Sequence, residues 1–413
     1  MSEFFDTLET RDPQQRERDL FSRLPAQIAH AKTHAPWFAG QLRGIDAAAI
    51  DSRAALAQLP VVRKHELIAL QKQFPPFGGL VASRWGSMGR VFSSPGPIYE
   101  PEGRNADYWR TARALFAAGF RAGDLVHNSF SYHMTPGGWI MESGALALGC
   151  TVFPGGVGQT EQQVQAMADL QPQGYVGTPS FLRILLEKAD ELGLKLGALS
   201  KALVSGEAFL PPVREAFAAR GIAGYQAYAT ADLGVIAYET PAREGLVVDE
   251  EVILEIVRPG TGDPVAEGEV GEVVVTTFNA TYPLIRFGTG DLSAVLPGLS
   301  PCGRTNRRIR GWLGRADQTT KVKGMFVHPE QVAAIVKRHP QILRARLVVT
   351  NPDSIDQMTL YCEAAAGATA DVTAAGVADA LRELTKLRGE VVLMAVGSLA
   401  NDGKVIDDQR KYD

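Results

Sequence analysis

Three short motifs in the carboxy-terminal half of the chain carry residue types that can bind a nucleotide. They are Tyr282–Asp291, Gly314–Asp317 and Lys321–Gly324. An apolar entry, a basic residue and a Gly-Thr-Gly turn would place Asp291 at a strand end, where a carboxylate can accept hydrogen bonds from both hydroxyls of a ribose. Further along, Arg315 offers a cation for phosphate. Each motif alone is also typical of a turn with a solvated charge, so their order and spacing carry the interpretation.

Composition narrows the function classes. The chain has 413 residues, 45% hydrophobic and 21% charged, which is typical of a globular protein with more than one domain. Its 42 basic and 46 acidic residues give a net charge of −4, so we expect no nucleic-acid partner and no membrane partner. The three cysteines are far apart, which argues against a disulfide framework and a thiolate metal cluster. Together with the absence of an apolar run in Met1–Arg18, this favours a cytoplasmic location.

The middle of the chain alternates between short apolar runs and helical stretches. Helices are expected at Gly138–Leu148 and Glu161–Leu170, with apolar runs such as Thr151–Phe153 and Tyr175–Gly177 between and after them. This alternation predicts parallel strands with right-handed crossovers, covered by helices on both faces. Ligand sites in such sheets lie beyond the carboxyl ends of the strands.

The pattern changes twice towards the carboxyl terminus. After Tyr228, apolar runs separated by Gly-rich and Pro-containing turns predict a hairpin-type, β-rich subdomain. Past Asp317, helices at Pro329–Lys337 and Ala375–Leu387 among strands predict a compact α+β unit. We therefore expect an α/β protein whose large amino-terminal domain, residues 1–315, has parallel sheets and a β-rich subdomain. A small α+β domain, residues 316–413, would follow it.

These motifs resemble the phenylacetate-coenzyme A ligase family of the adenylate-forming superfamily. The likeness covers nearly the whole chain and includes the segments Leu59–Lys64 and Leu148–Pro154. It implies an AMP-binding adenylation domain, a small mobile cap, and ATP, Mg²⁺ and coenzyme A as cofactors. The implied reaction joins an aromatic or other small organic carboxylic acid to coenzyme A through an acyl-adenylate. Relatives are commonly dimers, so a homodimer is the assembly that the resemblance allows.

The resemblance also implies where the nucleotide binds. Asp291 would hold the ribose hydroxyls and Arg315 would contact ribose or phosphate, while the adenine site would form between the Ser205–Ala208 turn and the Gln226–Tyr228 strand end. Tyr228 would stack its ring near the base, although a buried core tyrosine is the plain alternative. The expected nucleotide-binding residues are Ser93, Ser94, Gly96, Gly206, Glu207, Gln226, Ala227, Tyr228, Asp291 and Arg315.

Residues of the small domain would complete the reaction. In the family a lysine there bridges the substrate carboxylate and the α-phosphate, and Lys404 after Gly403 matches that position. A lysine on a frayed tail is the alternative. Asp317 corresponds to the hinge between half-reactions, and Lys323 with Gly324 would lie along the pantetheine arm of coenzyme A, where only glycine leaves room for the ligand.

The acid pocket is expected in the segment Ser131–Trp139. Gly137 and Gly138 would let an aryl ring approach the backbone, and His133 is a further candidate. A lone histidine is more often structural than functional.

Two departures from the family pattern leave alternatives open. The run Tyr228–Asp232 lacks a hydroxyl at Ala231 and shortens the metal-facing acid to Asp232, the expected Mg²⁺ ligand and catalytic acid. The phosphate loop is only Ser93–Tyr99, and its two prolines remove two amide donors. The loop either cradles pyrophosphate weakly or no longer serves ATP. A nucleotide or acyl-CoA binding protein on the same fold, and an adenylating enzyme with a non-CoA acceptor, are the rival interpretations.

Overall fold

The computed structural model describes residues 3–94, 97–316, 318, 320–322, 325–352, 356–365 and 370–410. The chain divides into two compact units. The first comprises Met1–Leu254, Val275–Phe287 and Leu296–Trp312, and the second comprises Glu255–Val274, Gly288–Val295 and Leu313–Asp413. The second unit therefore includes part of the β-rich region as well as the carboxy-terminal residues.

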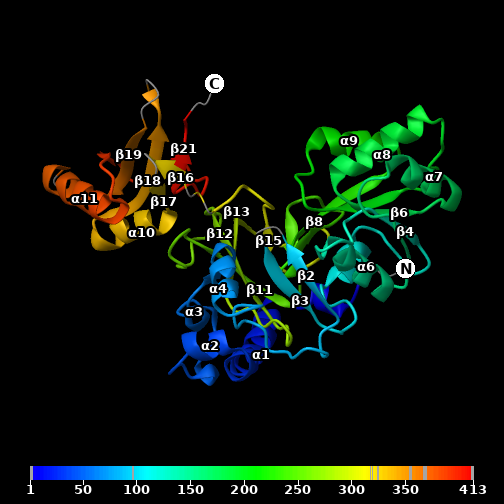
Figure 1. Ribbon diagram of the computed structural model, residues 1–413, viewed down its shortest axis with the longest axis horizontal. Coiled ribbons are helices and arrows are strands. Elements are labelled where there is room, and N and C mark those ends of the chain that lie inside the picture. The colour runs from blue at the N-terminus through cyan, green and yellow to red at the C-terminus, as the bar shows by residue number, and fades with distance from the viewer. Residues whose placement is uncertain are drawn as a thin grey trace. The chain divides into compact units, whose positions relative to one another are not determined.

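A mixed β-sheet forms the centre of the first unit (Figure 1), with the strand order β14-β15-β10-β9-β8-β7-β6-β4-β5. Its parallel strands are β4 (Leu125–Asn128), β5 (Thr151–Pro154), β6 (Gly174–Gly177), β7 (Lys201–Val204) and β8 (Ala223–Thr230). The connecting helices are α6 (Gly137–Ala147), α7 (Thr160–Leu170), α8 (Pro179–Glu191) and α9 (Pro211–Ala219). The remaining strands are β9 (Gly234–Glu239), β10 (Leu246–Val248), β14 (Val295–Leu296) and β15 (Arg308–Ile309). The α/β class predicted from the alternating pattern is confirmed.

Helix α8 illustrates why the sequence forms these crossovers. The Thr178 side chain caps it by accepting a hydrogen bond from the Phe181 amide, and Pro179 occupies its first turn, where a missing amide costs nothing. Its buried residues recur at helical spacing: Leu182, Leu185, Leu186 and Ala189. One face of the helix is therefore apolar and packs in the core beside the sheet.

The first unit has further elements before this sheet. The helices are α1 (Pro13–His34), α2 (Pro36–Gln41), α3 (Arg53–Leu56), α4 (Leu67–Gln73) and α5 (Thr111–Ala117), with short 3₁₀ turns at Thr7–Thr10, Ala47–Ala49 and Lys64–Glu66. The strands are β1 (Val62–Arg63) and the antiparallel hairpin of β2 (Arg90–Ser94) and β3 (Ile98–Glu102). This hairpin carries Ser93 and Ser94 of the predicted phosphate loop. None of the helices in the described part of the chain has the length and apolarity that a bilayer crossing needs.

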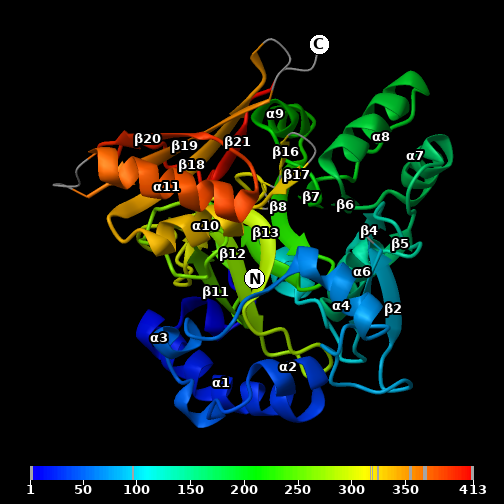
Figure 2. The same cartoon turned by 60° about the vertical axis from the view of Figure 1, so that its left-hand side comes forward.

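The second unit contains a compact α+β region with the strand order β20-β19-β18-β21. Figure 2 shows its two helices together on one face of the sheet, where their side chains share a core with the strands. The elements are α10 (Pro329–Arg338), β18 (Ile342–Thr350), β19 (Gln357–Ala364), α11 (Ala370–Thr385), β20 (Glu390–Met394) and β21 (Ile406–Asp408), preceded by the hairpin of β16 (Thr320–Val322) and β17 (Met325–Val327). The strands β11 (Val252–Val257), β12 (Gly271–Thr277) and β13 (Phe287–Ser293) belong partly to each unit.

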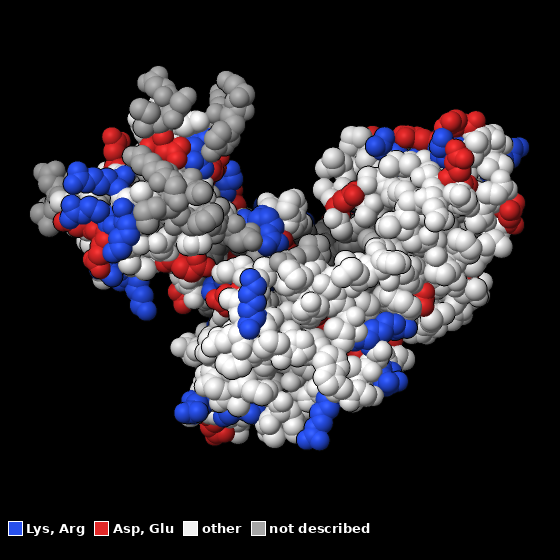
Figure 3. Space-filling model, viewed as in Figure 1, with Lys and Arg blue, Asp and Glu red and all other residues white. Residues whose placement is uncertain are grey.

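Charged side chains are spread over the surface. On the face drawn in Figure 3, basic and acidic side chains of the described residues are interspersed. This mixture agrees with the small net charge of −4.

The structure corrects one local prediction. Asp291 does not end a strand, because β13 continues through it to Ser293, and the Gly-Thr-Gly run lies within the strand. The strand continues because a second segment pairs with it: the Leu292 amide donates to the Gly314 carbonyl at 2.9 Å, and the Ala316 amide donates to the Gly290 carbonyl at 2.7 Å. Gly290 has a φ of +74°, a conformation that glycine adopts without a steric penalty.

The close approach of α5 and α6 gives a stability test. A Cβ added to Gly144 would lie 2.5 Å from Thr111 Cβ and 2.6 Å from the Ala112 amide nitrogen. We expect Gly144→Ala to lower the free energy of unfolding by about 1–3 kcal/mol, because the helices must move apart. Gly40→Ala in α2 is the control, since nothing lies within 4 Å of its added Cβ and alanine favours helix. Denaturant unfolding measures both, and equal effects would contradict the packing argument.

Candidate active site

A pocket of about 200 Å³ lies in the first unit, where β7 and β8 end. Three residues predicted for different parts of the site line it together: Ser94 from the phosphate loop, Gly206 from the adenine turn and Gly137 from the acid pocket. The full lining is Ser94, Phe130, Thr135, Pro136, Gly137, Ile140, Met141, Ser205, Gly206, Ala229, Thr230 and Ala231. The fold therefore collects these residues at the carboxyl ends of parallel strands, as expected for this sheet type.

The predicted adenine turn follows β7 directly. Gly206 has a φ of +81°, which allows the sharp turn after Ser205, whose hydroxyl donates to the Ala227 carbonyl at 2.8 Å. Glu207 accepts a hydrogen bond from the Ser180 hydroxyl at 2.8 Å. Gln226 lies opposite Val204 in the sheet, so the two predicted halves of the adenine site are neighbours. Tyr228 is half-buried beside them on β8.

Asp232 lies just after β8 and is only 4% exposed. Its Oδ2 accepts a hydrogen bond from Lys64 Nζ at 2.6 Å, whereas its Oδ1 is buried with no hydrogen-bond partner among the described residues. Lys64 is a functional candidate that the sequence interpretation missed, since it was part of a family-typical segment with no role assigned. The charge of Lys64 was visible in the sequence, but its partner Asp232 lies far away along the chain.

A second buried carboxyl group lies near Asp232. Glu100 on β3 is fully buried, and its carboxyl accepts hydrogen bonds from the hydroxyl and the backbone amide of Ser94. Burial, and then the negative charge of Asp232, raise the pKa of Glu100 to about 8, while Ser94 and Lys64 oppose the rise. Burial and the charges of Asp232 and Glu100 also hold the pKa of Tyr282 well above its usual value, and its hydroxyl has no described hydrogen-bond partner. The cluster is therefore acidic and largely dry.

In the second unit the structure brings together the two residues predicted for ribose and phosphate. Arg315 donates to Asp291 Oδ1 at 2.9 Å, and Asp291 is 8% exposed. The guanidinium lies over Gly290, where an added Cβ would come within 2.7 Å of it. A side chain at position 290 would therefore displace the guanidinium from its present position.

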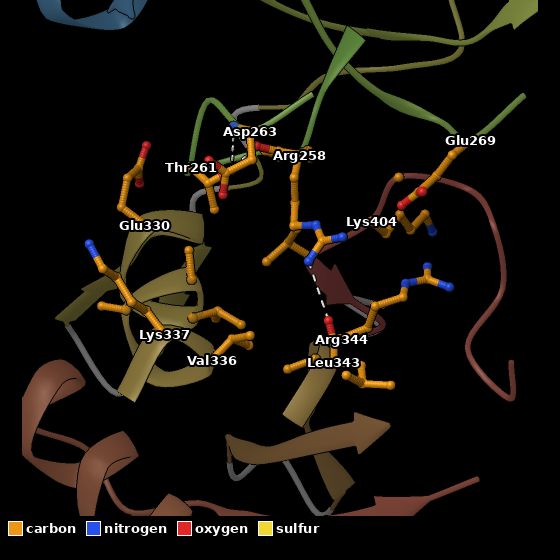
Figure 4. Close-up of a pocket in the computed structure, with 18 of the residues that line it drawn as sticks. Arg258, Thr261, Asp263, Glu269, Glu330, Val336, Lys337, Leu343, Arg344 and Lys404 are labelled. Atoms are coloured by element: carbon orange, nitrogen blue, oxygen red, sulfur yellow. Dashed lines mark hydrogen bonds between the residues drawn. The ribbon is translucent and has the colours of Figure 1, made fainter. Parts of the chain in front are cut away.

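Lys404 lies at another pocket of the second unit, of about 530 Å³ (Figure 4). Its Nζ pairs with Asp407 at 2.7 Å and its side chain is about half exposed. Around it the pocket presents both signs of charge, including Arg258, Glu269 and Arg344. The backbone here is not frayed, because the amides of residues 405 and 406 donate to Gln318 Oε1 and residues 406–408 form β21.

Other predicted residues are not brought to either pocket. His133 is exposed and is not among the described lining residues, and Gly138 is buried where an added Cβ would meet the Tyr132 ring at 2.9 Å. Ser93 donates its amide to the Met134 carbonyl at 2.8 Å. Four predicted residues lie outside the described residues: Gly96, Asp317, Lys323 and Gly324.

Comparisons with known proteins agree with this geometry. The model of the AMP-binding enzyme family matches residues 109–281. The phenylacetate-coenzyme A ligase of Aromatoleum evansii is 31% identical over 359 residues, covering 83% of this chain and 80% of that protein. The protein of the same name from Thermus thermophilus is 30% identical with the same coverage. A crystal structure of 2-hydroxyisobutyryl-CoA ligase, in complex with 2-HIB-AMP and CoA in the thioesterification state, matches with a TM-score of 0.72 and 25% identity, covering 99% of this chain and 93% of that one.

A strand-end pocket, an AMP-binding match and a whole-chain structural likeness define an adenylate-forming enzyme. The chain belongs to the phenylacetate-coenzyme A ligase family. It is accordingly an AMP-forming acid-CoA ligase that uses ATP and coenzyme A.

The raised pKa of Glu100 predicts a pH-dependent stability. Folding favours the protonated carboxyl, so the stabilisation is complete below the ordinary value of 4.5 and is lost as the pH rises through about 8. We expect the free energy of unfolding of the wild type, relative to Glu100→Gln, to fall by about 2 kcal/mol between about pH 5 and about pH 8. Urea titrations at several pH values measure this difference. Burial also raises the pKa of Asp249, to about 6, and the comparison removes that contribution because both proteins share it. A pH-independent difference would contradict the prediction.

Proposed function

We propose that this enzyme activates a small carboxylic acid, aromatic or aliphatic, whose tail is uncharged. The observation that carries the proposal is the pocket at which Ser94, Gly137 and Gly206 meet. A carboxylate placed there would have the predicted adenine turn on one side and the predicted phosphate loop on another. That arrangement is what attack on an α-phosphate requires.

The lining of this pocket supports the choice of substrate. Its walls include Phe130, Ile140, Met141 and Ala229, and none of its described lining residues is ionisable. A second charge on the substrate would be desolvated without a partner, which is costly. With a volume of about 200 Å³, the pocket suits a single ring or a short branched chain. Related proteins are named for phenylacetate and for 2-hydroxyisobutyrate, which are acids of this kind.

For the nucleotide, we assign the ribose hydroxyls to Asp291 and a phosphate to Arg315. The 2.9 Å bond from Arg315 orients the Asp291 carboxylate, whose oxygens are acceptors of the kind that ribose hydroxyls need. Gly206, Glu207, Gln226, Ala227 and Tyr228 would surround the adenine. Gly206 leaves room for a flat ring because it has no side chain.

Magnesium fits this site with one protein carboxylate. Asp232 Oδ1 is buried without a partner, and the described residues contain no group of three or more acidic, histidine or cysteine side chains that could hold a metal. Mg²⁺ keeps several waters and commonly binds through one or two carboxylates plus phosphate oxygens, so Asp232 is a suitable ligand. The ion would offset the repulsion between the phosphates and the substrate carboxylate. Asp232 would orient it, with Lys64 holding Oδ2 of the same carboxylate.

Lys404 is our candidate for the cation that bridges the substrate carboxylate and the α-phosphate. Among the described residues, its half-exposed ammonium group pairs with Asp407, three residues further along the chain. Asp317 as hinge, and Lys323 with Gly324 along coenzyme A, remain proposals that rest on the family resemblance. We also propose a cytoplasmic location, since Cys150, Cys302 and Cys362 are all free thiols.

The test is ATP–pyrophosphate exchange across a panel of acids. We expect exchange with small acids that have uncharged tails. In Lys404→Ala we expect the exchange rate to fall about 100-fold, because preorganised charge at a developing anion contributes on this scale. The same variant should convert a supplied acyl-adenylate and coenzyme A to thioester at the wild-type rate. Lys337→Ala is the matched control, since Lys337 is an exposed lysine on the same pocket. A folded wild type that is silent with every acid would refute the proposal.

Gly137 provides a test of the acid pocket itself. An added Cβ would lie 3.5 Å from the Phe130 ring, an ordinary contact, so Gly137→Ala should be tolerated. Gly137→Val adds volume to a small pocket, and we expect the KM for the acid to rise about tenfold with the KM for ATP unchanged. Steady-state kinetics with the best acid measure both constants. Equal changes in the two KM values would argue that the acid binds elsewhere.

A further inference from the structure

Ser94 has two hydrogen-bond donors, and the structure turns both of them towards one buried side chain. Its hydroxyl donates to Glu100 Oε1, and its backbone amide donates to Glu100 Oε2 at 3.3 Å. Ser94 nonetheless lines the pocket of the candidate active site. In this structure the hydroxyl and the backbone amide of Ser94 both face Glu100 and not a phosphate in the pocket.

Ser94 and Glu100 lie in the hairpin that carries the predicted phosphate loop, so their hydrogen bonds affect which donors a phosphate could use. Ser94 ends β2 and Glu100 lies on β3 of the same hairpin, where the predicted phosphate loop is short and contains two prolines. Each of these prolines removes one backbone amide donor from the loop. Glu100 is fully buried, so water does not compete for its carboxyl. Breaking the hydrogen bonds between Ser94 and Glu100 is consequently unfavourable, because a buried polar group would lose its partner.

The neighbouring cation is engaged in a similar way. Lys64 Nζ lies 2.6 Å from Asp232 Oδ2, and Asp232 is buried beside Glu100 in the same acidic cluster. Near the predicted phosphate loop, Glu100 thus accepts hydrogen bonds from the hydroxyl and the amide of Ser94, and Asp232 accepts one from the ammonium group of Lys64. A polyphosphate entering here must compete with them, whereas a ligand with only an α-phosphate need not.

We propose that Glu100 is a positioning residue that holds Ser94 away from the β- and γ-phosphates and so makes the enzyme favour adenylates over ATP. This rests on the proposed function, in which the loop faces the triphosphate. It deepens that function with one consequence: pyrophosphate formed by adenylation would receive no hydrogen bond from the donors that Glu100 retains, and would therefore leave readily. The acyl-adenylate, which lacks these phosphates, stays bound for the second half-reaction.

The experiment compares the affinities of the full chain for Mg·ATP and for AMP by calorimetry. In Glu100→Ala, Ser94 is released, and we expect ATP to bind about tenfold more tightly, the value of one or two recovered hydrogen bonds, with AMP unchanged. Glu100→Gln keeps an acceptor for the Ser94 hydroxyl and should stay close to the wild type. In the double variant Ser94→Ala with Glu100→Ala the gain should shrink, because the hydroxyl is removed while the backbone amide of residue 94 remains.

The control is Glu102→Ala. Glu102 lies two residues along on the same face of β3 and is equally buried, but it binds Arg90 and Trp109 instead of Ser94. It should lose stability without changing the ratio of the two affinities. If Glu100→Ala does not fold, Glu100→Leu fills the same space without an acceptor and gives the same readout.

The outcomes separate cleanly. Tighter ATP binding in Glu100→Ala that needs Ser94 supports the proposal. Weaker or unchanged ATP binding, a gain that is undiminished without the Ser94 hydroxyl, or no nucleotide binding by any variant overturns it. The proposed function fails by a different observation, namely silence in the exchange assay although ATP binds.

Discussion

The ion pair between Lys64 and Asp232 is the interaction on which the active site depends. It balances a carboxylate that is 4% exposed, next to a second carboxyl group that is fully buried, in a place where the family binds a polyanion. Removing one partner of such a pair strands an uncompensated charge, which typically costs about 3–5 kcal/mol. Asp232 Oδ1 has no hydrogen-bond partner among the described residues, which is why we propose it as the metal ligand. Lys64 therefore offsets the free-energy cost of burying the negative charge of Asp232.

A backbone constraint has the same importance in the second unit. Arg315 reaches Asp291 only across Gly290, whose positive φ and missing side chain leave space for the guanidinium. The pairing of β13 with Gly314 and Ala316 brings the two residues to this position. We propose this pair for nucleotide contact, and backbone hydrogen bonds between the two segments hold their main chains in register.

The sequence predicted what depends on local pattern and failed where distant segments meet. Helical spacing predicted the crossovers, and the family resemblance implied that Ser205 and Gln226 would lie near each other. The position of Asp291 inside a strand was missed, because its pairing partner is a segment whose proximity no local pattern encodes. Lys64 was missed for the same reason, since Asp232 is remote in the sequence.

Glu100 was missed for a different reason. An acidic residue in an alternating strand is ordinarily read as solvent-facing, and only the packing of the hairpin shows that it points inward. The departure of the phosphate loop from the family pattern was visible, but its physical consequence was not. That consequence requires knowing that both donors of Ser94 are already used. Residue types alone therefore identified where the site was unusual without indicating why.

The two lysines of the proposed mechanism differ in how firmly they are held, and this difference suits a reaction with two steps. Lys64 pairs with a buried carboxylate, and such a pair is not given up without a large cost. Lys404 pairs with Asp407 while its own side chain is about half exposed, and pairs of this kind contribute about 0–1 kcal/mol. An enzyme that adenylates and then transfers the acyl group needs a cation only in its first step. A cation with a weak resting partner can meet that need, because little free energy opposes its arrival or its departure.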